Sequence, residues 1–492
     1  MLVAVPLLAV ITSCATALVP ASPTQLELRR LVTPAEERFL MEELARIDPP
    51  TRITRLTSLA AVQRRLGGGF HGALPEPLDG PEAIPIPVDH AARLRAALFL
   101  ARQREAAREA LRALRVPYPL TFSGDEPPDL DRRDPPGRIR LTLDLSVPVR
   151  FLAALRDGQV TRDEAVKIAA LPANREMLRH RRALDYLPGP KPDRSELAEL
   201  IRRAGSDEPL DRLWAWLNPC NDLGYADLAS DPEQWTEFVV RLARLRHPLE
   251  AEVARRVAAY APENARLDAT FALTVGCLIR GWSTGEMAGL DLEQVKDDWG
   301  LLLGTMTEET YHRLELVLCP TSTGGHAAEF EGLASASTGD PRLDHLYEVL
   351  AYTVLEGAAN LARGPRPGIT GAGQAAAGRG LLDEITATLL DDGDLVRGEA
   401  LLGRGLRGNG PLYAEGFALA DAIAAARGPH AVGEALRKGP VAFVLEAAST
   451  PGGEALLTPR TLTAVGRLQR ALDDAARNRE FMLLTGPGAG LP

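Results

Sequence analysis

Residues 299–319, WGLLLGTMTEETYHRLELVLC, predict a long helix that is buried on nearly every side. One face of this helix is largely apolar and is formed by Trp299, Leu302, Leu303, Met306, Thr310, Leu314 and Val317. The opposite face holds Glu308 and His312, which are flanked by leucines, whereas a solvent-exposed face usually shows charges throughout. Ionisable side chains in an apolar setting need partners or a metal ion, so Glu308 and His312 are candidates for a site.

The spacing of Glu308 and His312 suits a shared ion, because residues four apart on a helix point the same way. The segment matches the zinc-peptidase motif H-E-x-x-H except at its first position, where Glu308 replaces histidine. In that motif the second residue is the general base that takes a proton from the metal-bound water. Glu309 holds this position and is the expected catalytic base.

A third metal ligand must come from another helix, because a catalytic zinc keeps three protein ligands and one open position. Glu356 is the natural candidate, since it lies on a predicted helix over residues 342–361 that is largely apolar. The polar residues of that helix form a single stripe, consisting of His345, Glu348, Tyr352 and Glu356. The same residues also fit an ordinary wet helix face, with Glu308 and His312 as an exposed pair, and the residues alone favour neither interpretation.

The composition is typical of a soluble globular protein, with 45% hydrophobic and 25% charged residues. The 56 basic and 66 acidic residues give a net charge of −10, and no basic block is present, so nucleic acid is not an expected partner. Aromatic residues make up only 5%, while alanine, leucine and arginine dominate, which favours helix.

The first 26 residues are uncharged, and residues 2–11 form a short apolar run followed by Ile11-Thr12-Ser13-Cys14. This run is too short to span a bilayer and resembles the core of a secretory signal or of a lipoprotein signal, which would place a lipid on Cys14. No Lys or Arg precedes the run, so a buried N-terminal strand is the alternative. We expect an exported protein, located in the periplasm, secreted, or anchored at the cell envelope by that lipid.

We therefore expect a signal at residues 1–22, a helical region with Pro- and Gly-rich linkers at 23–138, a main domain at 139–480 and a disordered tail at 481–492. Strand signals are few: residues 139–145 alternate cleanly, and residues 269–279 form an apolar run before the helix at 299–319. The predicted fold is mainly α, with a small β element before the helix that contains Glu308.

The region from about residue 145 to 450 resembles a large bacterial family of zinc-dependent, gluzincin-like peptidases. Five stretches in the family's order support the resemblance: VTRDEAVKIAALPANREMLRH at 160–180, TFALTVGCLIRGWSTGEMAGLDLE at 270–293, LLLGTMTEETYHRLE at 301–315, LEGAANLARGPRP at 355–367, and GPLYAEGFALADAIAAARGPHAVGEALRKGPVAFVLE at 410–446. The second stretch is similar to the family's glycine-bearing strand pair. The last is similar to its terminal helices and has Tyr413 and Gly416 at the Y-x-x-G step.

The resemblance implies a gluzincin-like helical domain in which His312 and Glu356 are metal ligands and Glu309 and Tyr413 are catalytic. Glu308 departs from the family pattern, since it stands where the first zinc histidine is expected. Glutamate can bind zinc, but three carboxylates around one ion would acidify the bound water less and would favour harder ions such as manganese, calcium or magnesium.

We therefore expect a metallopeptidase-like protein with a degenerate site, Glu308–His312–Glu356, and with weak or absent hydrolysis. Zinc, another divalent ion or no metal are all compatible with this sequence. The alternatives are a non-catalytic protein on the same fold that binds a peptide or protein or serves as a scaffold, and an active peptidase with altered metal preference. A helical protein with no metal site remains the third reading.

Overall fold

The computed structural model describes residues 138–183, 192–206, 215, 224–230, 232–275, 281–292, 299–319, 330–364, 371–407 and 410–485. Of these residues 75% are helical, and one small sheet is present, so the prediction of a mainly α fold is confirmed. The expected signal at 1–22, its Cys14 and nearly all of the region at 23–138 lie outside the described residues.

Two compact units make up the chain, and each is described by itself. The first contains Val147–Val239 among its described parts and is helical. Its helices are α5 (Ser146–Arg156), α6 (Arg162–Ala169), α7 (Pro172–Ala183), α8 (Arg194–Ala204), α10 (Gly224–Ser230) and most of α11 (Pro232–Arg244). In its core the rings of Phe151 and Tyr225 meet edge to face, with centroids 5.0 Å apart. Thr161 caps α6 by accepting a hydrogen bond from the backbone of Glu164.

The second unit is built on a four-stranded sheet with the strand order β1-β2-β4-β3. The strands are β1 (Ile139–Asp144), β2 (Leu267–Thr274), β3 (Gly281–Ser283) and β4 (Ala288–Asp291). β1, β2 and β4 are parallel, and β3 runs antiparallel to β4. The helix α12 (Arg246–Tyr260) packs on β1, where the Glu250 carboxylate accepts a 2.7 Å hydrogen bond from the Leu143 backbone. The alternating stretch at 139–145 thus forms a strand, and the sheet includes β1 as well as the segments before α13.

The remaining helices follow the sheet in the sequence. They are α13 (Trp299–Leu318), α14 (Phe330–Leu333), α15 (Pro341–Arg363), α16 (Ala372–Ala387) with a π-helical turn at Thr388–Asp392, α17 (Leu395–Leu406), α18 (Pro411–Arg427), α19 (His430–Leu436), α20 (Pro440–Ala448), a 3₁₀ turn at Gly453–Leu456, and α21 (Pro459–Thr485). α21 extends to Thr485, so the boundary predicted at 480/481 falls inside this helix.

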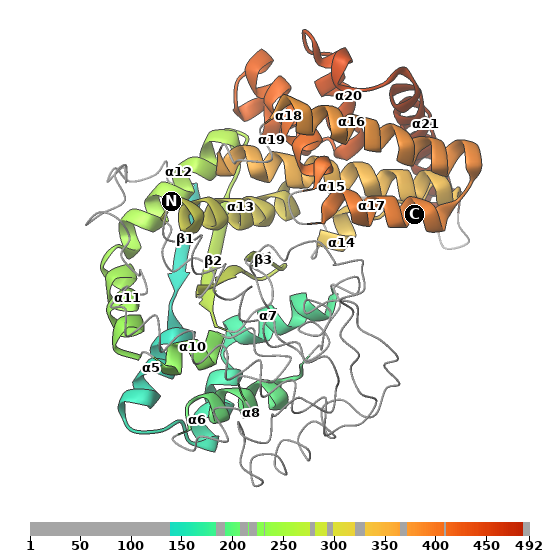
Figure 1. The fold of residues 1–492 in the computed structure, drawn as a ribbon. Helices are drawn as coiled ribbons and strands as arrows, with labels where there is room; N and C mark the ends of the chain where they lie inside the picture. Colours follow the sequence, from blue (N-terminus) through green and yellow to red (C-terminus); the bar gives the residue numbers. More distant parts are fainter. Residues whose placement is uncertain are drawn as a thin grey trace, which may run out of the picture. The chain divides into compact units, whose positions relative to one another are not determined.

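α15 lies between α13 and α18 (Figure 1), and its crossing with α18 is very close. A Cβ atom added to Gly416 of α18 would lie 1.8 Å from the Thr353 carbonyl oxygen of α15, and one added to Gly357 would lie 2.0 Å from the Gly416 carbonyl carbon. Two glycines are therefore required for the helix backbones to approach this closely. Gly357 follows Glu356 directly, so this crossing fixes the backbone beside a predicted ligand.

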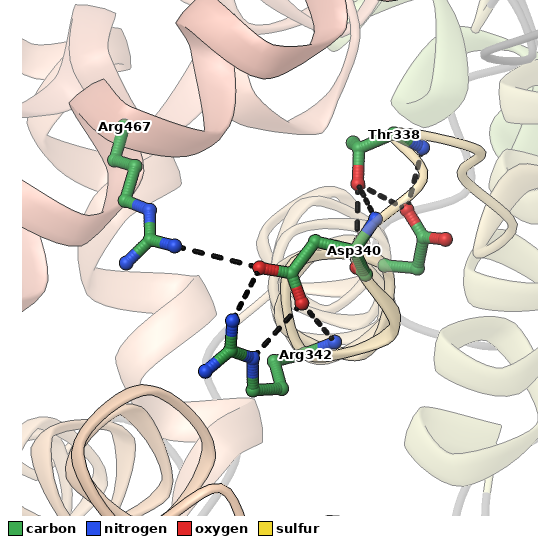
Figure 2. A network of polar contacts seen from close by, with 5 residues as sticks. Thr338, Asp340, Arg342 and Arg467 are labelled. Carbon is green, nitrogen blue, oxygen red and sulfur yellow. Dashed lines mark hydrogen bonds and ion pairs between the residues drawn. The ribbon is translucent and has the colours of Figure 1, made fainter.

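The first turn of α15 is held by a polar network at the protein surface (Figure 2). Asp340 is the N-cap and accepts a hydrogen bond from the Arg342 backbone, while its carboxylate pairs with the Arg342 guanidinium at 2.9 Å. Arg467 of α21 lies 3.4 Å from the same carboxylate. Thr338 donates to Asp344 at 2.7 Å. The start of α15 is thus connected to the last helix of the chain.

Within the described parts of the chain, none of the helices combines the length and the hydropathy that a membrane span requires.

Candidate functional site

The helix α13 is buried along almost its entire length, as its sequence predicts. Glu308 is 8% exposed and His312 is 5% exposed. This burial rules out the interpretation that the two residues are an exposed pair on a wet helix face. Two ionisable side chains in this setting require compensation, and their neighbours supply it.

His312 lies between two carboxylates. Its Nδ1 atom is 2.7 Å from Oε2 of Glu315, one turn further along α13. Its Nε2 atom is 3.7 Å from Oε2 of Glu356 on α15. The structure therefore brings together two of the predicted ligands, His312 and Glu356, from two different helices. Ligand atoms around a tetrahedral zinc are roughly 3.3 Å apart, given bond lengths near 2 Å, so this pair is close to the separation of a shared ion.

Sequence reasoning missed Glu315. It is completely buried, and its Oε1 atom is a buried acceptor without a hydrogen-bond partner. A carboxylate on the second ring nitrogen of a histidine orients the ring and raises its basicity, an arrangement that is common behind metal-binding histidines. The available signal was its spacing, since residues three apart on a helix are neighbours.

The carboxylate of Glu308 is not free to approach the space between His312 and Glu356, because it forms an ion pair with Arg363 at the end of α15. Both side chains are largely buried, at 11% and 7% exposure. The arginine lies across Gly304 of α13, where an added Cβ would be 3.0 Å from its Nε atom. Arg363 was also missed, although it follows Glu356 by seven residues and so shares its helix face.

Glu309, the predicted base, lies against β3. A Cβ atom added to Gly281 would be 2.2 Å from Oε1 of Glu309, so only glycine fits at this point of the strand. The side chain is half-buried, unlike that of Glu308. The glycine-bearing strand thus lies beside the residue that the resemblance makes catalytic.

The crowded carboxyl groups shift one another's protonation. Burial raises the pKa of Glu309 to about 8, with His312 opposing the shift and Glu308 and Glu356 adding to it. Burial likewise raises the pKa of Glu315 and of Glu356 to about 7 in each case, against the opposing effect of His312. Burial alone would lower the pKa of His312, but the contact with Glu315 and the charges of Glu356 and Glu309 raise it to about 10. The carboxyl groups around His312 thus favour the protonated form of its ring.

These residues do not fit a three-ligand zinc centre as they are arranged. Glu308 is bound to a guanidinium, so only His312 and Glu356 of the three predicted ligands lie close to each other. Across the described residues, no three His, Cys, Asp or Glu side chains are grouped so that they could hold a metal ion. The arrangement can instead hold protons and a positively charged side chain.

The other predicted residues lie on the same helices. Tyr413 is half-buried in the first turn of α18, three residues before Gly416, and its catalytic role remains a prediction. His345 pairs with Glu348 at 2.8 Å, one turn along α15, which accounts for part of the polar stripe.

Comparison of the chain with protein-family models, curated proteins and solved structures finds no match. The peptidase resemblance therefore rests on the residues quoted above.

Proposed function

We propose that this chain is a metallopeptidase-like protein with a degenerate metal site and with weak or absent hydrolase activity. The observation that supports the proposal most directly is the pairing of Glu308 with Arg363, in the position where the H-E-x-x-H motif has its first histidine. A residue that is held by a guanidinium is not available as a metal ligand. The site keeps other parts of the motif but lacks one of its ligands.

The retained parts support a peptidase-like origin of the site. Glu309 directly follows the altered position, His312 follows that position by four residues, and Glu356 approaches His312 from α15. Glu315 supports the ring of His312 from the opposite side. A buried helix next to a strand and a second helix with a facing carboxylate are together the arrangement that this chemistry needs.

A non-catalytic protein that binds a peptide or a protein is the second candidate. It is favoured by the partial exposure of Glu309, which lies against β3, and of Glu356 on α15, because two carboxyl groups are then accessible to a ligand. Such a protein would use the same site to hold a ligand and would not cleave it.

The experiment restores the motif. Because Arg363 faces position 308, the two positions are changed together in E308H/R363M and compared with R363M alone. We expect the double variant to bind zinc at least about tenfold more tightly than R363M, because a histidine nitrogen is added to the ligand set. Binding is measured by titration calorimetry on chelator-treated protein.

Two further variants determine whether this gain belongs to the proposed site. H312A and E356A, each placed in the E308H/R363M background, should abolish the added zinc affinity. A double variant that gains no affinity, or one whose affinity survives H312A and E356A, would overturn the proposal.

Hydrolysis separates the candidate functions. Wild type should cleave a mixed peptide library slowly or not at all with zinc or with manganese, and E308H/R363M should cleave it faster in a way that E309Q abolishes. Rapid cleavage by wild type with manganese would instead identify an active peptidase with altered metal preference. Binding of peptide without cleavage would favour the second candidate.

A further inference from the structure

Arg363 is the last residue of α15, and its side chain reaches back to α13. The guanidinium pairs with Glu308, and its stem lies across Gly304, which precedes Glu308 by one turn of the same helix. An added Cβ at position 304 would be 3.0 Å from Nε and 3.2 Å from Cγ of the arginine. The absence of a side chain at Gly304 therefore leaves the space in which Arg363 lies.

The carboxyl groups around Arg363 need positive charge. Four glutamates lie near His312 or Arg363: Glu308 and Glu315 are buried, and Glu309 and Glu356 are half-buried. In a metal site this charge would come from the ion. Here it comes from side chains, and Arg363 supplies it permanently because a guanidinium does not lose its proton in proteins.

A metal ion and the Arg363 guanidinium would compete to neutralise the carboxylates of this site. A divalent ion bound between His312 and Glu356 would belong to the same buried cluster as the guanidinium that pairs with Glu308, and like charges repel more strongly in a buried setting than in water. Glu308 would also have to leave a partner that is 7% exposed, and an unpaired buried cation is costly.

We infer that Arg363 takes the place of the metal ion, so that α13 and α15 are held together at this site by a resident side-chain cation and without a bound ion. This inference rests on the proposed function, and it specifies how the site is neutralised. Arg363 is a positioning residue: it keeps Glu308 on α13 and the end of α15 together. Its loss opens the carboxylate cluster to divalent ions.

The test compares R363M with R363K and with R342M, all in the full chain. R342M is a matched control, because Arg342 also pairs with an acidic residue of α15, at 2.9 Å from Asp340, but is 42% exposed at the other end of the helix. Zinc and manganese affinities are measured by titration of chelator-treated protein, and melting temperature is measured with EDTA and with each metal.

EDTA should not change the melting temperature of wild type. In EDTA, R363M should melt about 4 °C below wild type, because the buried Glu308 carboxylate is left without its partner. R363M should bind zinc or manganese at least about tenfold more tightly than wild type, and the metal should restore its melting temperature. R363K, which keeps the charge, and R342M should both stay close to wild type in metal affinity.

The inference is overturned if folded R363M gains no more metal affinity than R342M, or if R363K gains as much as R363M. It is also overturned, whether or not R363M folds, if EDTA lowers the melting temperature of wild type and stoichiometric zinc restores it. The first two results leave the proposed function standing, because that proposal depends on the added affinity of E308H/R363M over R363M. Conversely, if E308H/R363M binds zinc no more tightly than R363M, the proposed function is overturned, but the comparison of R363M with R363K still tests the inference about Arg363.

Discussion

The two ends of α15 contain ion pairs of the same chemical kind in opposite surroundings. At the first turn, Asp340 pairs with Arg342 and Arg467, whose side chains are 42% and 49% exposed. At the last turn, Arg363 pairs with Glu308, and neither side chain exceeds 11% exposure. Exposed pairs contribute about 0–1 kcal/mol because water and salt screen them. Loss of one partner of a buried pair costs about 3–5 kcal/mol because it leaves an uncompensated charge.

The difference shows that the number of contacts is a poor guide to their importance. The first turn has the larger hydrogen-bond network, including the N-cap and Thr338, yet most of its groups can exchange protein partners for water. The last turn has a single ion pair that water cannot easily replace. We therefore expect the site end of α15, and not its capped end, to dominate the stability of this helix.

The largest effect should come from Glu308→Ala. This substitution leaves the Arg363 guanidinium buried without its partner, and we expect a loss of about 3–5 kcal/mol in the free energy of unfolding. Urea denaturation followed by circular dichroism measures the loss as a shift in the midpoint at unchanged slope. A loss under about 1 kcal/mol would show that water reaches the pair.

Removing both partners should be less harmful than removing one. In E308L/R363M no charge is left unpaired, and replacement of a buried ion pair by apolar side chains is often neutral or stabilising. We expect this double variant to be more stable than E308A in the same urea experiment. If the loss of stability in E308L/R363M equals the sum of the losses in E308L and in R363M, the two residues are not energetically coupled.

A buried carboxyl group on α18 provides a further comparison. Glu415 of α18 is 1% exposed, and burial raises its pKa to about 8, with the charge of Arg379 only partly opposing the shift. The folded chain thus holds this proton more tightly than the unfolded chain, in which the pKa is near 4.5. The stability that the proton contributes is complete below pH 4.5 and is lost as pH rises through about 8.

Glu415→Gln tests this dependence. The glutamine remains uncharged, so the difference in stability between the variant and wild type should move in favour of the variant as pH rises from about 5 to 9. Urea midpoints across that range provide the measurement, and D421N, at another acidic position of α18, is a control for a general charge effect. Parallel curves for E415Q and wild type would contradict the raised pKa.

The smallest effect should come from Asp340→Ala at the exposed end. The change removes an N-cap, which contributes about 1 kcal/mol, and two screened ion pairs. We expect a loss of about 1–2 kcal/mol, part of which should disappear in about 1 M NaCl because salt screens exposed charges. The loss in E308A should persist in the same salt. A larger loss in D340A than in E308A would reverse the comparison of the two helix ends.

Much of the fold could be predicted from local patterns. The apolar periodicity of residues 299–319 predicted α13 to within one residue of its end, and residues 342–361 predicted most of α15. The alternation at 139–145 predicted β1, although its pairing with β2, more than a hundred residues later, has no local signal. Helical spacing and caps depend on a few neighbouring residues, whereas the order of strands in a sheet depends on residues that are far apart in the sequence.

The candidate site could be predicted only in part for the same reason. The meeting of His312 with Glu356 was expected from the motif and the resemblance, and the structure brings these two side chains together. Arg363 was overlooked because its partner lies on another helix, and the angle between two helices depends on packing along their whole length. Glu315 was overlooked because its spacing of three residues from His312, the one signal available, is shared by many glutamates on the surfaces of helices.

Because α15 and α18 cross so closely, the position of the site residues on α15 also depends on α18, which lies about sixty residues further along the chain. Gly416 has no room for a methyl group against Thr353, so any larger residue there must push the two helix axes apart. Glu356 is adjacent to the contact and would be displaced with its helix, as would Arg363 two turns later. The packing of α18 against α15 therefore contributes to the position of α15 relative to α13, and so to the separation of the site residues on these two helices.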